Sequence, residues 1–374
     1  ASSSMSAFRS RNGGTTTAPT SAPTTTEAPA PIEFTFGSPL KVTNDRVSSA
    51  SDRWDLNFSL SFPERSAAPL LPILESITEK SGGKVTFTMY YSWSLFGVAD
   101  AVEYTANGVA DIAIIPPHEF PSIFKVNSVT SGLPLVGWPG SADATKIYSE
   151  LCLAFPELVE EFADNNLTLW GSYFMPPYNI YQTDRDQIIT PADLNGRKMI
   201  TASRDVQDLI RAKGGAPISS MVPSYFSDLS GGVADSVIAH INVLGAFGVV
   251  PDLVNSRTIF GDGGLLMYNL AYVFNTDTWE SLPGDIQQLF VDAYSDLVLN
   301  MTAGDLNLTN LFEGRLAEKG IDTYVLNEAE IAEWESLITP IRASLFSQLE
   351  SEGFTGVRTI YNTLKERIAY YKAQ

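Results

Sequence analysis

The stretches Asn107-Gly108-Val109-Ala110-Asp111 and Gly231-Gly232-Val233-Ala234-Asp235 decide the fold of this 374-residue chain. In each, a predicted helix ends at a glycine that can adopt a positive φ, and an apolar strand follows at once, at 112–115 and at 236–239. Because the same turn stands at equivalent places in two series of elements, we predict two similar α/β lobes. The alternative is a chance similarity between two short segments made of common residues.

The elements around both turns follow one order. Apolar spacing and glycine stops before the first turn predict strands at 33–36 and 85–91 and helices at 67–80 and 98–106. Around the second turn they predict strands at 198–200 and 218–222 and helices at 206–213 and 224–230. Alternating strands and helices with brief glycine-rich connections indicate parallel sheets with helices on their faces.

Two segments are expected to cross between the lobes. Residues 169–183 are rich in aromatic side chains and suit a strand beside a cleft, and a second crossing is expected at 265–275. From Trp279 onward the pattern is helical, with a start signal at residues 281–285. The predicted organisation is a leader at 1–31, a first lobe at 32–168 to which C-terminal helices at 276–374 return, and a second lobe with the crossing strands at 169–275.

Charge and cysteine content exclude several classes of function. The chain has 24 Lys and Arg against 43 Asp and Glu, a formal net charge of -19, which argues against nucleic acid and anionic membranes as partners. With a single cysteine, Cys152, neither an intramolecular disulfide nor a cysteine-based metal site can form. No apolar run approaches the roughly 18–20 residues of a membrane span.

Residues 1–31 are rich in Ser, Thr, Ala and Pro and have almost no large apolar side chain, so we expect a disordered tether. Because the chain begins at Ala1 without an apolar signal core, we hypothesise that an export signal has been removed. Stalks rich in Thr and Pro hold exported proteins off a surface. An expression leader is the alternative.

Catalytic patterns are missing. The sequence contains no Gly-x-Ser-x-Gly elbow, no Walker loop and no His-Glu-x-x-His, so we expect neither enzymatic activity nor a cofactor or metal. The two histidines, His118 and His240, follow equivalent strands of the two lobes. Ligands of open α/β sheets lie outside the carboxyl ends of strands, so both imidazoles are candidates to face a cleft. Hydrogen-bonded structural histidines are the alternative.

Between residues 33 and 350 the sequence resembles the solute-binding subunits of tripartite ATP-independent periplasmic (TRAP) transporters, the DctP-like family. The resemblance is carried, in order, by residues 108–113, Leu133-Pro134-Leu135, residues 190–199 (Thr-Pro-Ala-Asp-Leu-Asn-Gly-Arg-Lys-Met), Gly215-Ala216-Pro217, residues 232–235 and Trp279-Glu280-Ser281-Leu282-Pro283. It implies an α/β, two-lobed fold like that of periplasmic binding proteins, with inter-lobe crossing strands and C-terminal helices. It also implies an extracytoplasmic receptor, periplasmic or on the cell surface, that closes on a small organic solute and delivers it to membrane permease subunits.

The sequence departs from this family at the expected ligand site. The resemblance implies an arginine that clamps a substrate carboxylate, two residues after Lys198, and this position is Ile200. An expected acidic residue is Ser224 and an expected polar one is Ile238. The ligand is therefore expected to be neutral or weakly anionic, with apolar or aromatic area, or else the receptor function has been lost.

Candidate ligand contacts come from positions that match the family and from aromatic or polar residues beside the expected cleft. For each aromatic residue the alternative is ordinary core packing. The candidates are Tyr91, Trp93, His118, Glu119, Tyr173, Tyr178, Thr201, Tyr225, His240 and Asn242.

Two other functions fit the same sequence. One is an extracellular structural or filament-forming protein that keeps the fold and self-assembles through residues 1–31, since an extended leader can pair with a neighbour's sheet edge. The other is a sensory receptor that presents its ligand to a membrane kinase.

Overall fold

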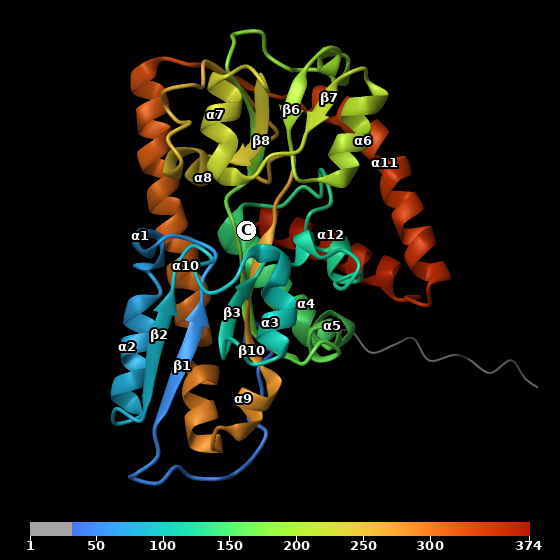
Figure 1. Cartoon of the computed structure of the whole chain (residues 1–374). Helices are drawn as coiled ribbons and strands as arrows, with labels where there is room; N and C mark the ends of the chain where they lie inside the picture. The colour runs from blue at the N-terminus through green and yellow to red at the C-terminus, as the bar shows by residue number, and fades with distance from the viewer. Residues whose placement is uncertain (1–31) are drawn as a thin grey trace, which may run out of the picture. The chain divides into compact units, whose positions relative to one another are not determined.

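The computed structural model describes residues 32–374, and the folded unit comprises Phe34–Gln374 (Figure 1). The predictions made for the leader, residues 1–31, lie outside the described residues. Two sheets, one of five strands and one of six, organise the unit, and helices pack around each of them. The chain therefore has the predicted α/β fold with two lobes.

The first sheet has the strand order β2-β1-β3-β10-β4. Strand β1 pairs in parallel with β2 and β3, whereas β10 is antiparallel to β3 and β4. The strands are β1 (Trp54–Ser59), β2 (Val85–Tyr90), β3 (Ile112–Ile115), β4 (Leu167–Phe174) and β10 (Asn269–Asn275). The helices around it are α1 (Glu64–Ala67), α2 (Leu71–Lys80), α3 (Ala101–Ala106), α4 (Ser141–Ala154) and α5 (Glu157–Ala163).

The second sheet has the order β11-β9-β5-β8-β6-β7. Strand β6 is parallel to β7 and β8, whereas β5 is antiparallel to β8 and β9. The strands are β5 (Tyr178–Gln182), β6 (Lys198–Ile200), β7 (Ala216–Ile218), β8 (Ser236–His240), β9 (Ser256–Ile259) and β11 (Asp322–Val325). Its helices are α6 (Arg204–Ala212), α7 (Tyr225–Ser230) and α8 (Ile241–Ala246).

Both predicted crossings are present. The chain passes from the first sheet to the second between β4 and β5, and it returns between β9 and β10. The two crossing segments are hydrogen-bonded to each other, because the amide of Tyr178 donates to Leu266 (2.9 Å) and that of Leu265 donates to Tyr178 (2.8 Å). The strand that enters each sheet by a crossing is the one that runs antiparallel to its neighbours. The predicted domain boundaries stay a prediction. Strand β4 (Leu167–Phe174), at the boundary predicted after residue 168, pairs in the first sheet.

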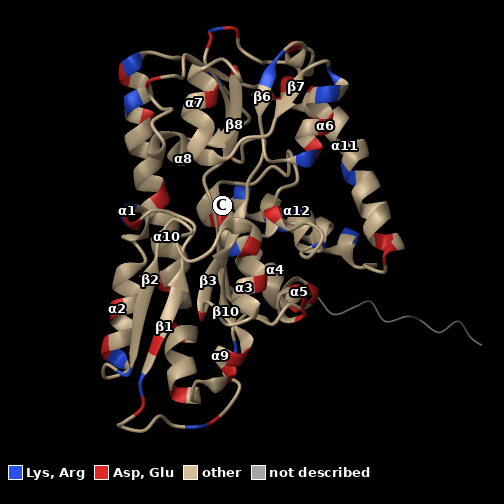
Figure 2. Cartoon of the chain, viewed as in Figure 1, with Lys and Arg blue, Asp and Glu red and all other residues tan. Residues whose placement is uncertain are grey.

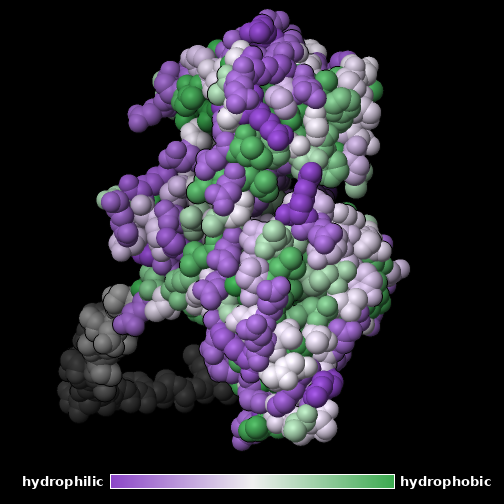
Figure 3. All heavy atoms as spheres, turned by 90° about the vertical axis from the view of Figure 1, so that its left-hand side faces the viewer, coloured by the Kyte–Doolittle hydropathy of each residue, from purple (hydrophilic) through white to green (hydrophobic). Residues whose placement is uncertain are grey.

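The C-terminal helices are α9 (Thr276–Ser281), α10 (Gly284–Lys319), α11 (Glu328–Ser351) and α12 (Val357–Lys372). Helix α10 has 36 residues and packs against α2 and β4 of the first lobe and α8 of the second. On the side of the molecule with α1, α2 and α10, apolar residues reach the surface among polar ones (Figure 3). The exposed large apolar side chains of α10 are Leu299, Leu306 and Leu311. No helix within residues 32–374 combines the length and apolarity that crossing a bilayer requires.

The two repeated turns have the same geometry in both lobes, which confirms that they are equivalent. Gly108 has φ 75° and Gly232 has φ 70°. The following aspartates fasten each turn to the neighbouring strand, since Asp111 Oδ2 accepts the amide of Asn57 (2.8 Å) and Asp235 Oδ2 accepts that of Lys198 (2.9 Å). Each Oδ1 accepts a hydroxyl, from Thr278 and from Ser236 respectively, both at 2.8 Å.

Three predicted elements are corrected by the structure. Residues 33–36 form no strand, and the first strand of the sheet is β1. The alternation of polar and apolar residues at 33–36 reflects side-chain packing instead, because Phe34 lies under the Arg367 guanidinium and Phe36 packs on Tyr294. The helix predicted at 67–80 is divided into α1 and α2 around Pro69, as the missing amide of proline dictates. The strand predicted at 218–222 is β7, which ends at Ile218.

Charged side chains lie mainly on helices and loops, whereas the central strands β3, β8 and β10 contain none (Figure 2). These strands are buried along their whole length. Their apolar residues form continuous cores with the helices, as expected for strands covered on both faces.

The aspartates of the two turns provide a test of this architecture. Replacing Asp111 or Asp235 by Ala removes one backbone and one hydroxyl bond, so each variant should lose about 1–3 kcal/mol of unfolding free energy. Urea denaturation followed by circular dichroism measures the loss. The control is Asp262→Ala, because Asp262 is exposed and its side chain forms no hydrogen bond within residues 32–374. Losses no larger than the control's would contradict this role.

Candidate ligand-binding site

Both histidines lie where the strands of the two sheets end, and two tyrosines connect them. His118 follows β3 and stacks on Tyr268, with ring centroids 3.7 Å apart. His240 ends β8 and lies 5.1 Å from Tyr178. The edge of one tyrosine meets the face of the other at 4.9 Å. Because Tyr178 and Tyr268 belong to the two crossing segments, this row of four rings runs from one lobe to the other.

Both imidazoles are neutral at physiological pH. Burial lowers the pKa of His118 and of His240 to about 3. Their Nδ1 atoms are sealed from solvent and have no hydrogen-bond partner within residues 32–374. Nε2 of His118 lies 3.7 Å from Oε1 of Glu119, but a neutral imidazole forms no ion pair there. The two rings are thus able to accept or donate one further hydrogen bond each.

A half-buried carboxylate that the sequence analysis missed interacts with residues of this row. Asp305 is on α10, and Nδ2 of Asn242 donates to its backbone carbonyl (2.9 Å) and to its Oδ1 (3.3 Å). Asn242 in turn accepts a hydrogen bond from Thr309 (3.1 Å). Burial raises the pKa of the Asp305 carboxyl to about 7, although the bond from Asn242 acts in the opposite direction. No Lys or Arg within residues 32–374 forms an ion pair with this carboxylate.

The charge of Asp305 acts on three tyrosines from different strands. Burial, and after it the charge of Asp305, raises the pKa of Tyr173 on β4 and of Tyr272 on β10. The pKa of Tyr178 on β5 is likewise raised, by burial first and by several neighbours that include Asp305. The rings of Tyr173 and Tyr272 lie 6.0 Å apart, and the Tyr272 hydroxyl is sealed without a partner. All three phenols therefore stay protonated and neutral.

The structure brings together seven of the ten candidate residues. Glu119 and Tyr225 belong to the group around Tyr178 and Tyr268, because the Glu119 carboxylate adds to burial in raising the pKa of Tyr225, to about 12. The seven are His118, Glu119, Tyr173, Tyr178, Tyr225, His240 and Asn242. Their assignment as ligand contacts stays a prediction.

The other three candidates make local contacts. Trp93 packs beside Phe96 at 6.4 Å, and Tyr91 faces Glu64, whose charge adds to burial in raising the pKa of Tyr91. Thr201 is buried and its hydroxyl accepts the amide of Ser203 (3.2 Å), which starts α6. These contacts place the three residues outside the row of rings.

The positions at which the sequence departs from the expected pattern hold no charge in the interior. Ile200 is 1% exposed and packs in an apolar cluster with Tyr225 and Val237. Ile238 is 3% exposed, and Ser224 lies on the surface at the start of α7. No guanidinium therefore occupies the buried position at the end of β6.

A cavity of about 1150 Å³ lies beside the row of rings. His118, Glu119 and Tyr268 line it on one side, residues 202–205 at the start of α6 on another, and α11 on the third. Its charged lining is mainly acidic, and Lys125, one of its two basic residues, is paired with Glu352 at 2.6 Å. The remaining ionisable groups are Arg204, Asp205 and Asp208.

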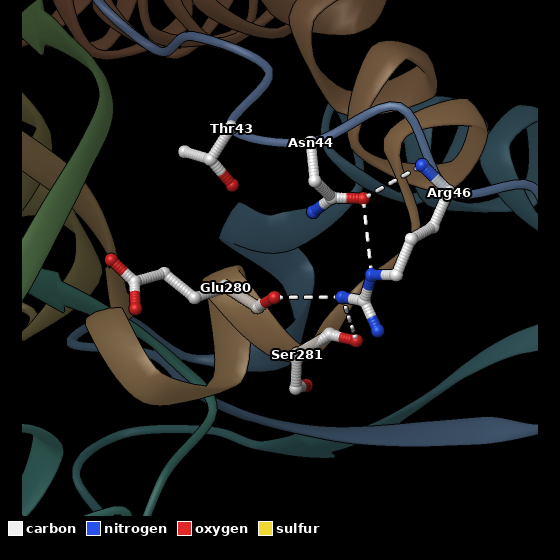
Figure 4. A pocket seen from close by; sticks show the side chains of 5 residues that line it. All are labelled: Thr43, Asn44, Arg46, Glu280 and Ser281. Carbon is white, nitrogen blue, oxygen red and sulfur yellow. Dashed lines mark hydrogen bonds between the residues drawn. The ribbon is translucent and has the colours of Figure 1, made fainter.

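A second hollow, shown in Figure 4, has a structural role. The guanidinium of Arg46 donates to the backbone carbonyls of Glu280 and Ser281, both at 2.9 Å, and to Leu282 at 3.2 Å. These carbonyls end α9, where a cation compensates for missing helical partners. Within residues 32–374, no group of His, Cys, Asp and Glu has the arrangement of a metal site.

Comparison with known proteins identifies the family. The model of the bacterial extracellular solute-binding protein family 7 (DctP) matches residues 63–364. The chain belongs to this family. Its two lobes, the crossings between them and the C-terminal helices are accordingly those of a solute-binding protein of TRAP transporters.

Solved structures share this fold at low sequence identity. A marine metagenome TRAP solute-binding protein, specific for aromatic acids and bound to metahydroxyphenylacetate, is 23% identical, with a TM-score of 0.73 over 84% of this chain and 98% of its own. One from Rhodoferax ferrireducens with copurified benzoate is 21% identical, with a TM-score of 0.73 over 86% and 99%. One from Chromohalobacter salexigens with d-glucuronate is 17% identical, with a TM-score of 0.72 over 84% and 100%.

The raised pKa of Asp305 makes the stability of this solute-binding protein depend on pH. A carboxyl with a pKa of 3.8 when unfolded and about 7 when folded favours the folded state below pH 4, and this contribution is lost as the pH rises to about 7. The isosteric Asp305→Asn variant cannot titrate. Its stability relative to the unmodified protein should therefore rise by about 2–3 kcal/mol between pH 5 and pH 8.

Urea unfolding of both proteins at several pH values measures this difference. The matched control is Asp296→Asn on the same helix, since Asp296 is exposed. A stability difference that is independent of pH, or equal to that of the control, would show that the fold does not raise the pKa of Asp305.

Proposed function

We propose that the chain is the extracytoplasmic receptor of a TRAP-type secondary transporter and that its ligand is a small organic compound, neutral or aromatic, without a carboxylate to be clamped. The proposed ligand class rests on one observation: the residue at the buried end of β6 is Ile200, which lies in an apolar cluster. Membership of the solute-binding family supports the first part.

The architecture suits a receptor that closes around its ligand. Two hydrogen-bonded crossing segments join the lobes, and such connections absorb the rotation when binding proteins close by a hinge. The row of His118, Tyr268, Tyr178 and His240 lies at these crossings. Aromatic walls with a few polar groups are the usual composition of small-molecule sites. We propose that closure delivers the ligand to membrane permease subunits and that no chemical conversion takes place.

The electrostatics of the cluster disfavour an organic acid. A carboxylate in a desolvated site needs an arginine or a comparable cation, ideally with two parallel hydrogen bonds. Here the neighbouring groups are neutral imidazoles, neutral phenols and two carboxyls, Glu119 and Asp305. A carboxylate ligand within the row of rings would lose its hydration without gaining a buried cation, because Arg204, the basic residue of the cavity lining that forms no ion pair within residues 32–374, is exposed. We therefore propose that this receptor does not bind the benzoate or glucuronate found in its structural neighbours.

The proposal predicts which compounds stabilise the purified full-length protein. A ligand at a hundredfold excess over its Kd should raise the unfolding free energy by about 3 kcal/mol, which a thermal shift detects. Benzyl alcohol, benzamide and other aromatic compounds without a carboxylate are the test set, and benzoate, 3-hydroxybenzoate and d-glucuronate are the matched acids. We expect stabilisation within the first set and none by the acids.

Native mass spectrometry of the protein from its own host identifies a copurified ligand independently. A bound carboxylic acid, or a melting shift with benzoate, would refute the proposed ligand class. Large assemblies without any bound small molecule would instead favour the structural protein that assembles through residues 1–31.

A further inference from the structure

We propose that His118 and Glu119 form a donor–acceptor pair that selects a neutral ligand with an amide-type edge, in which an N–H group lies beside a carbonyl oxygen. Primary carboxamides, lactams and ureas have such an edge. The inference rests on the proposed receptor function and narrows its ligand class. Both residues line the cavity of about 1150 Å³, so a ligand in this cavity can reach the pair.

Both members of the pair are free to bind a ligand. Nε2 of His118 makes no hydrogen bond within residues 32–374 and, unlike Nδ1 of the same ring, is not among the polar atoms that the interior seals off. The Glu119 side chain is 45% exposed, and its oxygens accept no hydrogen bond from the described residues. No Lys or Arg in this part of the chain pairs with its carboxylate.

The packing of His118 determines which nitrogen carries the proton. The ring stacks on Tyr268, and a Cβ atom on Gly132 would lie 2.8 Å from the Tyr268 ring and 3.6 Å from Cβ of His118, so the two rings have little space to turn. A sealed N–H group without an acceptor is costly, and the carboxylate 3.7 Å from Nε2 attracts a proton on that nitrogen. The neutral ring therefore presents an N–H donor to the cavity.

The spacing of the pair fits an amide edge. Nε2 of His118 and Oε1 of Glu119 are 3.7 Å apart, too far to bond to each other. Bonds of about 1.23 and 1.33 Å place the oxygen and nitrogen of an amide about 2.2 Å apart, so two hydrogen bonds of about 2.9 Å to the pair diverge by only about 15° each. A single hydroxyl bonded to both atoms would have to direct its two bonds about 80° apart, well below the tetrahedral angle. The amide edge thus satisfies both groups with the better geometry.

The charge of the pair disfavours other polar ligands. A carboxylate has no donor for Glu119 and would place a second negative charge beside it, whereas an ammonium has no acceptor for the N–H of His118. An amide N–H donates to a charged acceptor, which makes a stronger bond than one between neutral groups. Pro340, Ile341 and Leu345 of α11 line another side of the cavity, so the remainder of the ligand is expected to be apolar.

Benzamide and N,N-dimethylbenzamide form the decisive pair of probes, because the methyl groups remove the N–H donors and keep the ring and the carbonyl. δ-Valerolactam and its N-methyl derivative form a second pair without an aromatic ring, and benzoate is the matched acid. Isothermal titration of the full-length protein at neutral pH measures all five affinities. We expect at least one N–H compound to bind, at least tenfold more tightly than its methylated partner and than benzoate.

A change of specificity locates the effect. Glu119→Gln replaces an acceptor by a group that also has an N–H donor, so a carboxylate can accept hydrogen bonds from both residues. Benzoate should therefore bind this variant at least tenfold more tightly than it binds the unmodified protein, a gain that a merely structural residue would not produce. The control is Asp296→Asn, which removes a charge from an exposed position on α10 and should change neither affinity.

Variants of the donor complete the test. His118→Gln retains an N–H donor and should retain most of the affinity for the amide probe, whereas His118→Leu should lose at least tenfold. Circular dichroism confirms folding of every variant.

The outcomes separate this inference from the proposed function. If benzyl alcohol or a copurified neutral compound without an amide edge binds and no N–H probe does, the amide-type site is refuted and the receptor remains. Equal affinities for an N–H probe and its methylated partner, or no gain of benzoate binding in Glu119→Gln, also refute the site. If no neutral compound binds and none copurifies, the receptor function itself is refuted.

Discussion

The arrangement of both lobes depends on the close packing of helix α10 against them. A Cβ atom on Gly171 of β4 would lie 2.2 Å from the ring of Tyr294, and one on Gly245 of α8 would lie 2.2 Å from the ring of Phe312. Gly304, between these two contacts along the helix, would meet Pro69 at the same distance. Because the interior is close-packed, the helix has little freedom to shift against either lobe. Asp305, the residue after Gly304, therefore lies on a helix that packs against elements of both lobes.

The crossing segments add a second constraint and contain the two tyrosines of the row of rings. Backbone hydrogen bonds between Tyr178 and residues 265–266 hold the two crossing segments together. The lobes are therefore joined by one hydrogen-bonded pair of segments rather than by two separate linkers. Tyr178 and Tyr268 lie on this connection, and His118 and His240 reach it from strand ends of opposite lobes. A hinge rotation would therefore change the spacing of the histidines more than that of the tyrosines.

The sequence predicts the lobes well because their signals are local. A glycine with positive φ followed by an aspartate specifies the turn, and both turns form as predicted with matching hydrogen bonds. Strand 33–36 fails because tertiary contacts of Phe34 and Phe36 produce the same alternation as a strand. The site is only partly predictable: His118 and His240 follow from strand ends, whereas Asp305 looks like one more acidic residue on a long helix. Its one signal is the spacing from the buried Val298 and Thr302, which places it on the face of α10 that packs inward.

The charge in this region depends on α10 rather than on β6. Ile200 leaves the end of β6 apolar, within a cluster that also contains Tyr225 and Val237. Asp305 instead places a carboxyl on a helix that packs against elements of both lobes, where Asn242 of α8 donates to its Oδ1. In the proposed receptor, a charge on α10 is thus positioned by contacts with both lobes, whereas a charge on β6 would be positioned by the second lobe alone.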